Sequence, residues 1–487
     1  MNDMMPHWLT QQAFLSPNVT AIELENGNQI TFSELKQRSQ EMAYQIATYG
    51  IHEGDHVAIL SKNDPKMIIT IHALSYLGAT VVLLNTRLTP SELQYQINDA
   101  NVSLLIYHDD FNDKVKQLFI KDSLSFVELK SLSMSTEVTL KKEIRLSDPF
   151  TIIYTSGTTG FPKGVIHTYG NHWWSAISSA LNIGLSKTDK WLAVLPFFHV
   201  GGLSIFLKSV IYGMPVYLME KFNVSKVNQA IVENQVTMIS VVTVMLQRLM
   251  EQLGDNRYPD TFRGMLLGGG PASKQLLEQA KQKNIPVFQS YGMTETSSQI
   301  VTLSAHDALR KIGSSGKPLL PAQIKIHRET SDGIGEIYVK GPMVTNGYYN
   351  NDKANEELFE HGWLKTGDLG RIDKEGFLYV VDRRNDLIIS GGENIYPTEI
   401  EHVLERISHI REVAVVGKKD DTWGEVPVAY VVCDTETLTE DNIIDYAKRH
   451  LASYKVPKQI IFLDELPRNA SNKILRHELK ALLQAKK

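Results

Sequence analysis

The sequence YTSGTTGFPKG occupies residues 154–164 and follows an apolar run, residues 150–154, that predicts a buried strand. It is rich in glycines and hydroxyls and has a lysine near its end. Glycines let the backbone approach a ligand closely, while N–H groups, hydroxyls and an ammonium group can donate to phosphate oxygens. It differs from the pattern G-x-x-x-x-G-K-S/T, because Pro162 precedes Lys163 where glycine is required. The stretch therefore predicts a polyphosphate-binding loop, with a surface turn as the simpler alternative.

The composition is that of an ordinary globular protein. The chain has 487 residues, 43% hydrophobic and 22% charged, which suggests about three folding units with large cores. A net charge of −5 gives no reason to expect a nucleic acid partner. Residues 1–12 do not resemble a signal peptide, and proline and glycine interrupt the most apolar window, residues 192–207, so we expect no membrane insertion. Cys433 is the only cysteine, which excludes an intrachain disulfide and favours a cytoplasmic location.

Alternating strand and helix patterns extend to about residue 310. The short apolar runs expected as strands are residues 57–60, 80–84, 192–195, 216–219, 238–242, 265–267 and 287–289. Helical stretches separate them, as in parallel sheets that are covered on both faces. Asn26-Gly27 marks a hairpin turn, and Thr31 with Glu34 and Thr89 with Glu92 are capping-box pairs that open helices.

The pattern changes in the last third of the chain. Short strands at 323–327, 335–339 and 377–381 predict a small β-barrel or antiparallel sheet. A charged break at residues 382–386 is the expected hinge, and strands and helices alternate beyond it. The predicted fold class is α/β: a large N-terminal domain of two parallel-rich α/β sheets plus a small β-barrel, with a small mobile α+β C-terminal domain. The predicted boundaries are residues 1–384 (α/β subdomains about 1–310, β-barrel about 311–384) and 385–487.

Two glycine-containing turns each follow a predicted strand. They are LLGGGPA, residues 266–272, and QSYGMTE, residues 289–295. Open α/β sheets bind ligands at the carboxyl ends of their strands. A single glycine turn is weak evidence, but two turns from neighbouring strands predict the walls of one slot.

Together with three later stretches, these sequences resemble the adenylate-forming superfamily, which includes acyl-CoA synthetases, peptide-synthetase adenylation domains and luciferases. The later matches are WLKTGD at 363–368, DRRNDLIISGGENIYP at 382–397 and LPRNASNKILR at 466–476. The resemblance covers nearly the whole chain and implies ATP, Mg²⁺ and CoA, the last as a substrate. Asp382 and Asn472 stand where family members usually have glycine, and Asn385 where Asp or Lys is common, so the hinge position stays open.

The resemblance also implies a role for individual residues. The expected catalytic residues are Lys473 and Thr294 at the reacting carboxylate and α-phosphate, Glu295 as the Mg²⁺ ligand, and His199. The expected nucleotide-binding residues are Thr155, Ser156, Gly157, Thr158, Thr159, Lys163, Gly268, Gly269, Gly270, Pro271, Ser290, Tyr291, Gly292, Met293, Asp368 and Arg383. Gly391 and Gly392 would line the channel for the pantetheine arm of CoA. Trp423 is a weaker candidate for a CoA contact, and packing in the core is at least as plausible a role for it.

These roles fit one reaction. A carboxylate is a poor electrophile, and its transfer to AMP removes the charge and provides a leaving group. No cysteine is placed to accept the acyl group, so an external thiol is implied; the resemblance indicates CoA, reached by rotation of the C-terminal domain.

The most detailed prediction concerns which carboxylic acid is the substrate. By resemblance, residues 171–174 and 195–204 border the acyl pocket, where Lys208 and Ser297-Ser298-Gln299 are too polar for a fatty-acyl tunnel. This favours an aromatic dicarboxylic keto-acid, whose second carboxylate would pair with Lys208 or His199. Lys208 as a surface residue and His199 as a mere gate are alternatives. A CoA ligase for another aryl or medium-chain acid, an adenylation domain and a noncatalytic nucleotide-binding module also remain open, as does a homo-oligomer.

Overall fold

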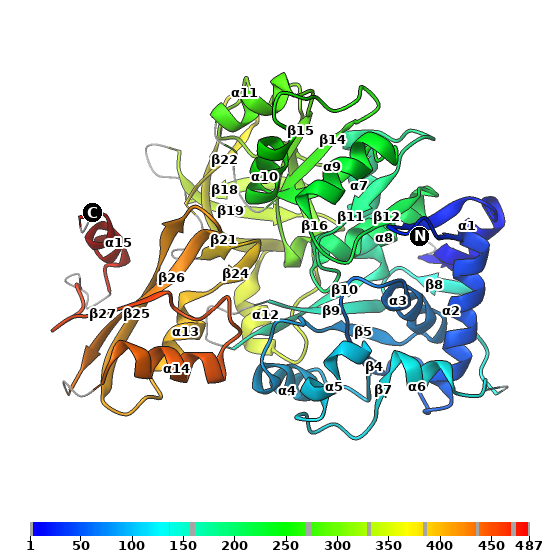
Figure 1. The fold of residues 1–487 in the computed structure, drawn as a ribbon, viewed down its shortest axis with the longest axis horizontal. Coiled ribbons are helices and arrows are strands. Elements are labelled where there is room, and N and C mark those ends of the chain that lie inside the picture. Colours follow the sequence, from blue (N-terminus) through cyan, green and yellow to red (C-terminus); the bar gives the residue numbers. More distant parts are fainter. Residues whose placement is uncertain are drawn as a thin grey trace. The chain divides into compact units, whose positions relative to one another are not determined.

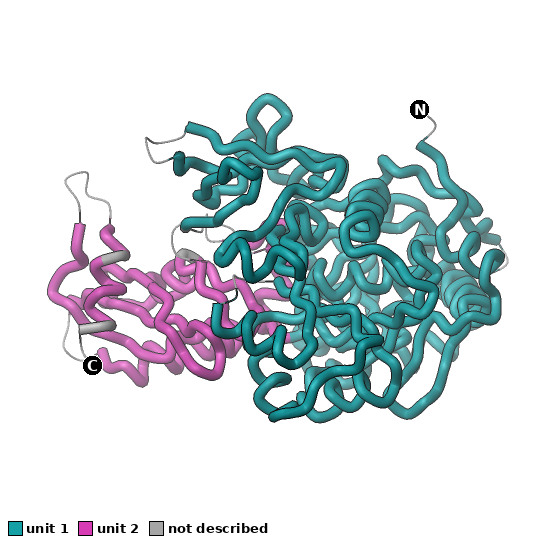
Figure 2. Tube along the Cα trace, turned by 90° about the horizontal axis from the view of Figure 1, so that it is seen from above, with its two compact units in different colours: residues 1–86, 97–154, 164–381 teal, residues 87–96, 155–163, 382–487 magenta. Residues whose placement is uncertain are grey.

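The computed structural model describes residues 3–135, 137–155, 161–268, 272, 274–328, 333–382, 387–434, 438–468 and 474–485 (Figure 1). The chain divides into two compact units, teal and magenta in Figure 2. Unit 1 comprises residues 1–86, 97–154 and 164–381; unit 2 comprises residues 87–96, 155–163 and 382–487. In the described part of the chain, every helix is too short or too polar to cross a bilayer.

Two α/β sheets are built mainly from unit 1, as the strand and helix alternation predicted. The described strands of the first sheet have the order β10-β9-β5-β4-β6-β7, and the pairs from β9 to β7 are parallel. Those of the second have the order β17-β16-β15-β14-β13-β11-β12-β2-β3, parallel from β15 to β2.

The first sheet contains β4 (His56–Leu60), β5 (Thr80–Leu83), β6 (Leu104–Tyr107), β7 (Ser123–Ser125), β9 (Pro149–Thr155) and β10 (Lys163–Thr168). The second contains β2 (Thr20–Leu24), β3 (Gln29–Thr31), β11 (Trp191–Ala193), β12 (Val216–Leu218), β13 (Met238–Val242), β14 (Gly264–Gly268), β15 (Val287–Met293), β16 (Ser298–Leu303) and β17 (Lys317–Pro318). A separate antiparallel pair joins β1 (Met4–Pro6) to β8 (Glu143–Arg145).

Helices begin where the capping sequences predicted. Thr31 Oγ1 accepts the N–H of Glu34 at 3.2 Å, and the Glu34 carboxylate accepts the N–H of Thr31 at 2.9 Å. Thr89 and Glu92 form the same reciprocal pair at the start of the helix that begins at Pro90. The helices up to residue 282 are α1 (Trp8–Leu15), α2 (Phe32–Ala47), α3 (Pro65–Leu77), α4 (Pro90–Asp99), α5 (Asn112–Val115), α6 (Phe126–Lys130), α7 (Tyr169–Ile183), α8 (Val200–Tyr212), α9 (Val224–Glu233), α10 (Thr243–Leu253) and α11 (Lys274–Gln282).

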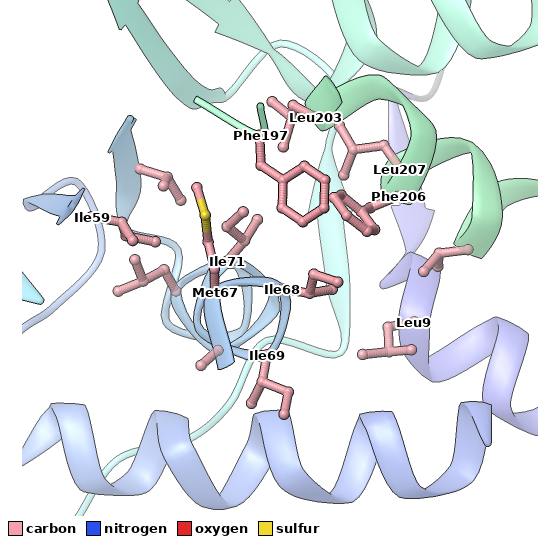
Figure 3. Packing of buried hydrophobic residues seen from close by; sticks show 14 of the residues in the cluster. Leu9, Ile59, Met67, Ile68, Ile69, Ile71, Phe197, Leu203, Phe206 and Leu207 are labelled. Atoms are coloured by element: carbon pink, nitrogen blue, oxygen red, sulfur yellow. The ribbon is translucent and has the colours of Figure 1, made fainter. Parts of the chain in front are cut away.

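The largest core of unit 1 packs α3 against α8 and the loop that precedes α8. Met67 and Ile71 of α3 point toward Phe197 and Phe206 (Figure 3). The rings of Phe197 and Phe206 meet edge to face, with centroids 3.9 Å apart. Burying a large apolar side chain contributes roughly 1.5–3 kcal/mol, so this core fixes the helix that carries Lys208.

An antiparallel sheet completes unit 1, as the strands after residue 310 predicted. Its described strands run β18-β19-β21-β20, and β22 pairs with β21. They are β18 (Gln323–His327), β19 (Gly335–Lys340), β20 (Phe359–Glu360), β21 (Trp363–Ile372) and β22 (Leu378–Asp382), with α12 (Asp352–Leu358) between β19 and β20.

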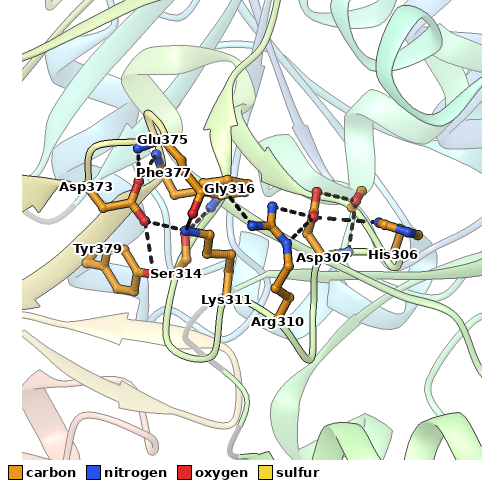
Figure 4. A network of polar contacts seen from close by, with 11 residues as sticks. His306, Asp307, Arg310, Lys311, Ser314, Gly316, Asp373, Glu375, Phe377 and Tyr379 are labelled. Atoms are coloured by element: carbon orange, nitrogen blue, oxygen red, sulfur yellow. Dashed lines mark hydrogen bonds and ion pairs between the residues drawn. The ribbon is translucent and has the colours of Figure 1, made fainter.

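A charged cluster ties the β21–β22 turn to the segment after β16 (Figure 4). Lys311 Nζ lies 2.8 Å from Asp373 and 2.5 Å from Glu375, and Arg310 lies 2.6 Å from Glu375. Burial of the Asp373 carboxylate would raise its pKa, but hydrogen bonds from Lys311 and backbone N–H groups hold the pKa at about 2. The cluster therefore anchors the last strand of unit 1.

Unit 2 contains a further mixed sheet with flanking helices, the α+β pattern predicted for the C-terminal region. Its described strands run β24-β23-β26-β25, and β27 is parallel to β26. Gly391 and Gly392 form the β23–β24 turn with φ of 59° and 89°, a conformation that favours glycine. The elements are β23 (Ile388–Ser390), β24 (Glu393–Ile395), β25 (Ile410–Asp420), β26 (Gly424–Cys433), β27 (Gln459–Phe462), α13 (Pro397–Leu404), α14 (Glu440–His450) and α15 (Arg476–Ala485).

Candidate active site

The two predicted glycine-containing turns follow adjacent strands. β14 and β15 are parallel neighbours, so their carboxyl ends lie at the same edge of the sheet. Ser290 Oγ donates to the carbonyl of Leu267 at 3.0 Å, beside Gly268. The rest of the first turn, Gly269, Gly270 and Pro271, lies outside the described residues.

Tyr291 and Asp368 meet although they are far apart in sequence. The Tyr291 hydroxyl donates to the Asp368 carboxylate at 2.8 Å, and the Tyr291 side chain is buried. This contact brings the residue expected beside adenine to the residue expected at the ribose. Gly292 has a local reason to be glycine, because a Cβ there would overlap the carbonyl oxygen of Ser298 in the β15–β16 hairpin.

Thr294 and Glu295 lie in a short 3₁₀ turn, η2 (Thr294–Thr296), directly after Met293 at the end of β15. Glu295 is buried, its carboxylate accepts a hydrogen bond from the Tyr348 hydroxyl at 2.8 Å, and its carbonyl accepts one from the Thr345 N–H at 2.8 Å.

A carboxylate fixed in this way is the type of oxygen ligand that Mg²⁺ prefers, together with phosphate oxygens and water. In the described part of the chain, no three His, Cys, Asp or Glu side chains gather to hold a metal ion by themselves. The single Glu295 carboxylate fits Mg²⁺ that is also bound by the phosphate oxygens of a nucleotide.

Two buried histidines lie behind this turn. His167 Nε2 is 2.7 Å from the carbonyl oxygen of Thr294, and His167 Nδ1 is 3.3 Å from Thr151 Oγ1. Thr151 Oγ1 is also 2.9 Å from His172 Nε2. Burial lowers the pKa of His167 to about 4, and burial together with His167 lowers the pKa of His172 well below its usual value. Sequence reasoning missed His167, since a single histidine in a strand carries no pattern.

The loop before α8 carries His199 at the helix N-terminus. Asn63, which follows β4, donates to the carbonyls of Leu195 and Met219 at 3.1 and 3.2 Å. Its side-chain oxygen accepts the N–H of Phe197 at 3.1 Å. This buried amide fixes the loop that the sequence assigned to the acyl pocket, and it too was missed.

Lys208 on α8 is a buried cation. Its side chain is 1% exposed, and Nζ lies 5.3 Å from the centre of the Trp191 ring. Among the described residues, no carboxylate pairs with this ammonium group, and burial lowers the pKa of Lys208 to about 8. The alternative of a surface lysine is therefore wrong.

The phosphate loop is described only at its ends, which belong to unit 2. Thr155 closes β9 and Lys163 opens β10. Phe161 stacks on Tyr95 with ring centroids 5.4 Å apart. The expected phosphate-binding residues between them, Ser156, Gly157, Thr158 and Thr159, lie outside the described residues, as do Arg383 and Lys473.

The hairpin expected to border the pantetheine arm packs on Trp423. The N–H of Gly391 donates to the Trp423 carbonyl at 2.8 Å, and a Cβ at Gly391 would lie 2.8 Å from the indole ring. Trp423 is 49% exposed, so it is not a core residue. A side chain at Gly391 would disturb this contact, and it would also narrow the channel expected for the pantetheine arm.

The chain matches the family model of the AMP-binding enzyme over residues 9–349 and that of the AMP-binding enzyme C-terminal domain over residues 399–473. A 2-succinylbenzoate–CoA ligase from Oceanobacillus iheyensis is 58% identical over 482 residues, covering 98% of this chain and 100% of the relative. One from Bacillus anthracis is 51% identical over 491 residues, covering 99% and 100%.

Solved structures of o-succinylbenzoate CoA synthetase from Bacillus subtilis are also similar. A mutant bound to a product analogue has 47% identity and a TM-score of 0.94, covering 98% of this chain and 99% of that one. The complex with the acyl-adenylate intermediate has 47% identity and a TM-score of 0.77, covering 98% of each. On this evidence of matched domains and full-length relatives, the chain belongs to the AMP-binding enzyme family.

Proposed function

We propose that this protein is an ATP-dependent 2-succinylbenzoate–CoA ligase of menaquinone biosynthesis. It converts 2-succinylbenzoate, ATP and CoA to 2-succinylbenzoyl-CoA, AMP and pyrophosphate, and it acts in the cytoplasm. Full-length relatives with this activity in their names support the reaction. The observation in this chain that carries the choice of acid is Lys208, a buried ammonium group without an anionic partner among the described residues. A dicarboxylic acid would supply the missing anion through the carboxylate that is not activated.

In the first half-reaction, one carboxylate oxygen of the acid attacks the α-phosphorus of ATP, the bond to pyrophosphate breaks, and an acyl-adenylate forms. Thr294 is proposed to donate to the α-phosphate, and Asp368 to accept from the ribose hydroxyls. Glu295 would hold Mg²⁺, which neutralises phosphate charge when bound. Lys163, Arg383 and Lys473 are proposed to supply the remaining positive charge.

In the second half-reaction, the CoA thiol loses its proton and attacks the acyl carbonyl. The bond between carbonyl carbon and phosphate oxygen breaks, and AMP leaves. The turn at Gly391 and Gly392 is proposed to border the pantetheine arm, with the half-exposed Trp423 ring beside it.

Steady-state kinetics on an acid panel test this proposal. The panel is 2-succinylbenzoate, its two analogues that each lack one carboxylate, benzoate and octanoate, with pyrophosphate release and thioester formation both measured. We expect 2-succinylbenzoate to have the highest kcat/KM, and Lys208→Met to lower this value at least about tenfold, the effect of leaving one buried charged group unpaired. The same substitution should scarcely change kcat/KM for the analogue that keeps only the activated carboxylate.

Stronger activity on benzoate or octanoate would contradict the choice of acid but leave an acid–CoA ligase. Absence of pyrophosphate release with every acid would favour the noncatalytic nucleotide-binding module. Light scattering on the same sample would decide whether the active form is a homo-oligomer, the alternative to a monomer that the sequence leaves open.

A further inference from the structure

A chain of three buried side chains ends on the backbone of the Thr294–Glu295 turn. The order is His172, Thr151, His167 and then the carbonyl oxygen of Thr294, with separations of 2.9, 3.3 and 2.7 Å. His172 comes from α7, Thr151 from β9 and His167 from β10, so three elements converge behind one peptide group. All three side chains are buried.

The final acceptor fixes the direction of every hydrogen bond in this chain. A carbonyl oxygen can only accept, so His167 Nε2 carries a proton. In a neutral imidazole the other nitrogen is then an acceptor, so the Thr151 hydroxyl donates to His167 Nδ1. The Thr151 oxygen in turn accepts from His172 Nε2–H. Each histidine is thereby held in one tautomer and one ring orientation.

The backbone after the turn is strained and needs such support. Ser297 and Ser298 have φ of 53° and 99°, in the region that L residues rarely adopt. Residues persist there only when their surroundings over-determine the conformation. Ser175 Oγ donates to the Ser297 carbonyl at 2.7 Å, and the Ser297 N–H donates to the Thr294 carbonyl at 3.0 Å.

We propose that His167 is a positioning residue for adenylation. By holding the Thr294 carbonyl, it sets the orientation of the peptide that joins Thr294 to Glu295, and so aims the Thr294 hydroxyl and the Glu295 carboxylate. This inference rests on the proposed function, in which these two groups meet the α-phosphate and Mg²⁺. Tyr348 and Thr345 hold Glu295 independently, so loss of His167 misaligns the turn without releasing it.

Two variants of His167 distinguish the effect of its hydrogen bond to the Thr294 carbonyl from the effect of its packing in the core. His167→Gln keeps an N–H donor close to the position of Nε2, whereas His167→Asn keeps a polar side chain but cannot reach the Thr294 carbonyl. Removing a partner that orients a metal ligand typically costs about 10- to 100-fold in metal affinity or activity. We expect that loss in His167→Asn and activity within about threefold of wild type in His167→Gln.

The informative readouts are the two half-reactions and the Mg²⁺ concentration at half-maximal rate. His167→Asn should slow ATP–pyrophosphate exchange and raise the Mg²⁺ requirement, while thioester formation from preformed acyl-adenylate stays unchanged. Thr151→Val, which breaks the chain one step earlier at nearly constant volume, should give a smaller loss in the same half-reaction. It also provides the test if His167→Asn does not fold.

Equal losses in both half-reactions, or a His167→Gln enzyme as defective as His167→Asn, would overturn the inference. If only the role of His167 is wrong, wild-type protein still catalyses ATP–pyrophosphate exchange, and only the pattern among the variants differs from the expected one. If the proposed function is wrong, wild-type protein shows no ATP–pyrophosphate exchange at all.

Discussion

Two lysines buried in different units of this protein have opposite surroundings. Lys208 in unit 1 and Lys455 in unit 2 are 1% and 3% exposed. Lys455 Nζ lies 2.6 Å from Glu399 and 2.7 Å from Glu92, both in unit 2. Lys208 Nζ lies 5.3 Å from the centre of the Trp191 ring and pairs with no carboxylate among the described residues.

The charges follow from these surroundings. Burial alone would lower the pKa of both lysines. For Lys455 the two carboxylates outweigh burial and raise its pKa, while for Lys208 burial is unopposed and the pKa falls to about 8. A cation that the fold uses for its own stability is paired within the fold. An unpaired buried cation weakens the fold, and in the proposed function the second carboxylate of the substrate is its partner.

Breaking the paired lysine should have the largest effect on stability. Lys455→Met leaves the buried Glu399 and the partly buried Glu92 without their cation, and removing one partner of a buried ion pair costs about 3–5 kcal/mol. We expect a loss of this size in the free energy of unfolding, measured by urea denaturation at neutral pH. Lys458→Met, at an exposed position three residues later, is the matched control and should change stability by less than about 0.5 kcal/mol.

Removing the unpaired lysine should stabilise the protein, the opposite of the effect expected for Lys455→Met. The pKa of Lys208 drops from 10.5 unfolded to about 8 folded, so at pH 7 the buried charge costs roughly 3 kcal/mol at about 1.4 kcal/mol per pH unit. Between pH 8 and 10.5 the unfolded state binds more protons, so stability should rise with pH in the wild type. Lys208→Met should unfold at higher urea than wild type at pH 7 and lack that rise. A Lys208→Met protein as destabilised as Lys455→Met would show that Lys208 is paired after all.

Local signals made much of the fold predictable. The predicted strands at 238–242 and 323–327 coincide with β13 and β18, because an apolar or alternating run bounded by turn residues specifies a strand by itself. The capping pair of Thr31 and Glu34 acts over three residues and is equally local. The small pairing of β1 with β8 joins residues about 140 positions apart and left no local trace.

The site was predictable in kind but not in its supporting contacts. Glycine turns after two strands predicted one slot, and the resemblance to the adenylate-forming superfamily assigned roles to Gly268, Tyr291 and Glu295 that stay predictions. The bonds from Tyr291 to Asp368 and from His167 to Thr294 depend on tertiary packing that no sequence window contains. The burial of Lys208 did have a signal: residues 203–211 are apolar on nearly every face, which is typical of a buried helix.

The finest test of the two-lysine comparison is the pH dependence of adenylation. If Lys208 binds a substrate carboxylate, kcat/KM for the acid should fall above about pH 8, by up to tenfold per pH unit, as the free enzyme loses that proton. Pyrophosphate release is the appropriate assay, because CoA takes no part in adenylation and the ionisation of its thiol therefore does not affect the measured rate. Lys208→Arg will be less active, because the two cations differ in shape, but its guanidinium stays protonated and the alkaline fall should vanish. A fall at the same pH in Lys208→Arg would assign it to another group, and Lys208 would then lack the external partner that its unpaired charge implies.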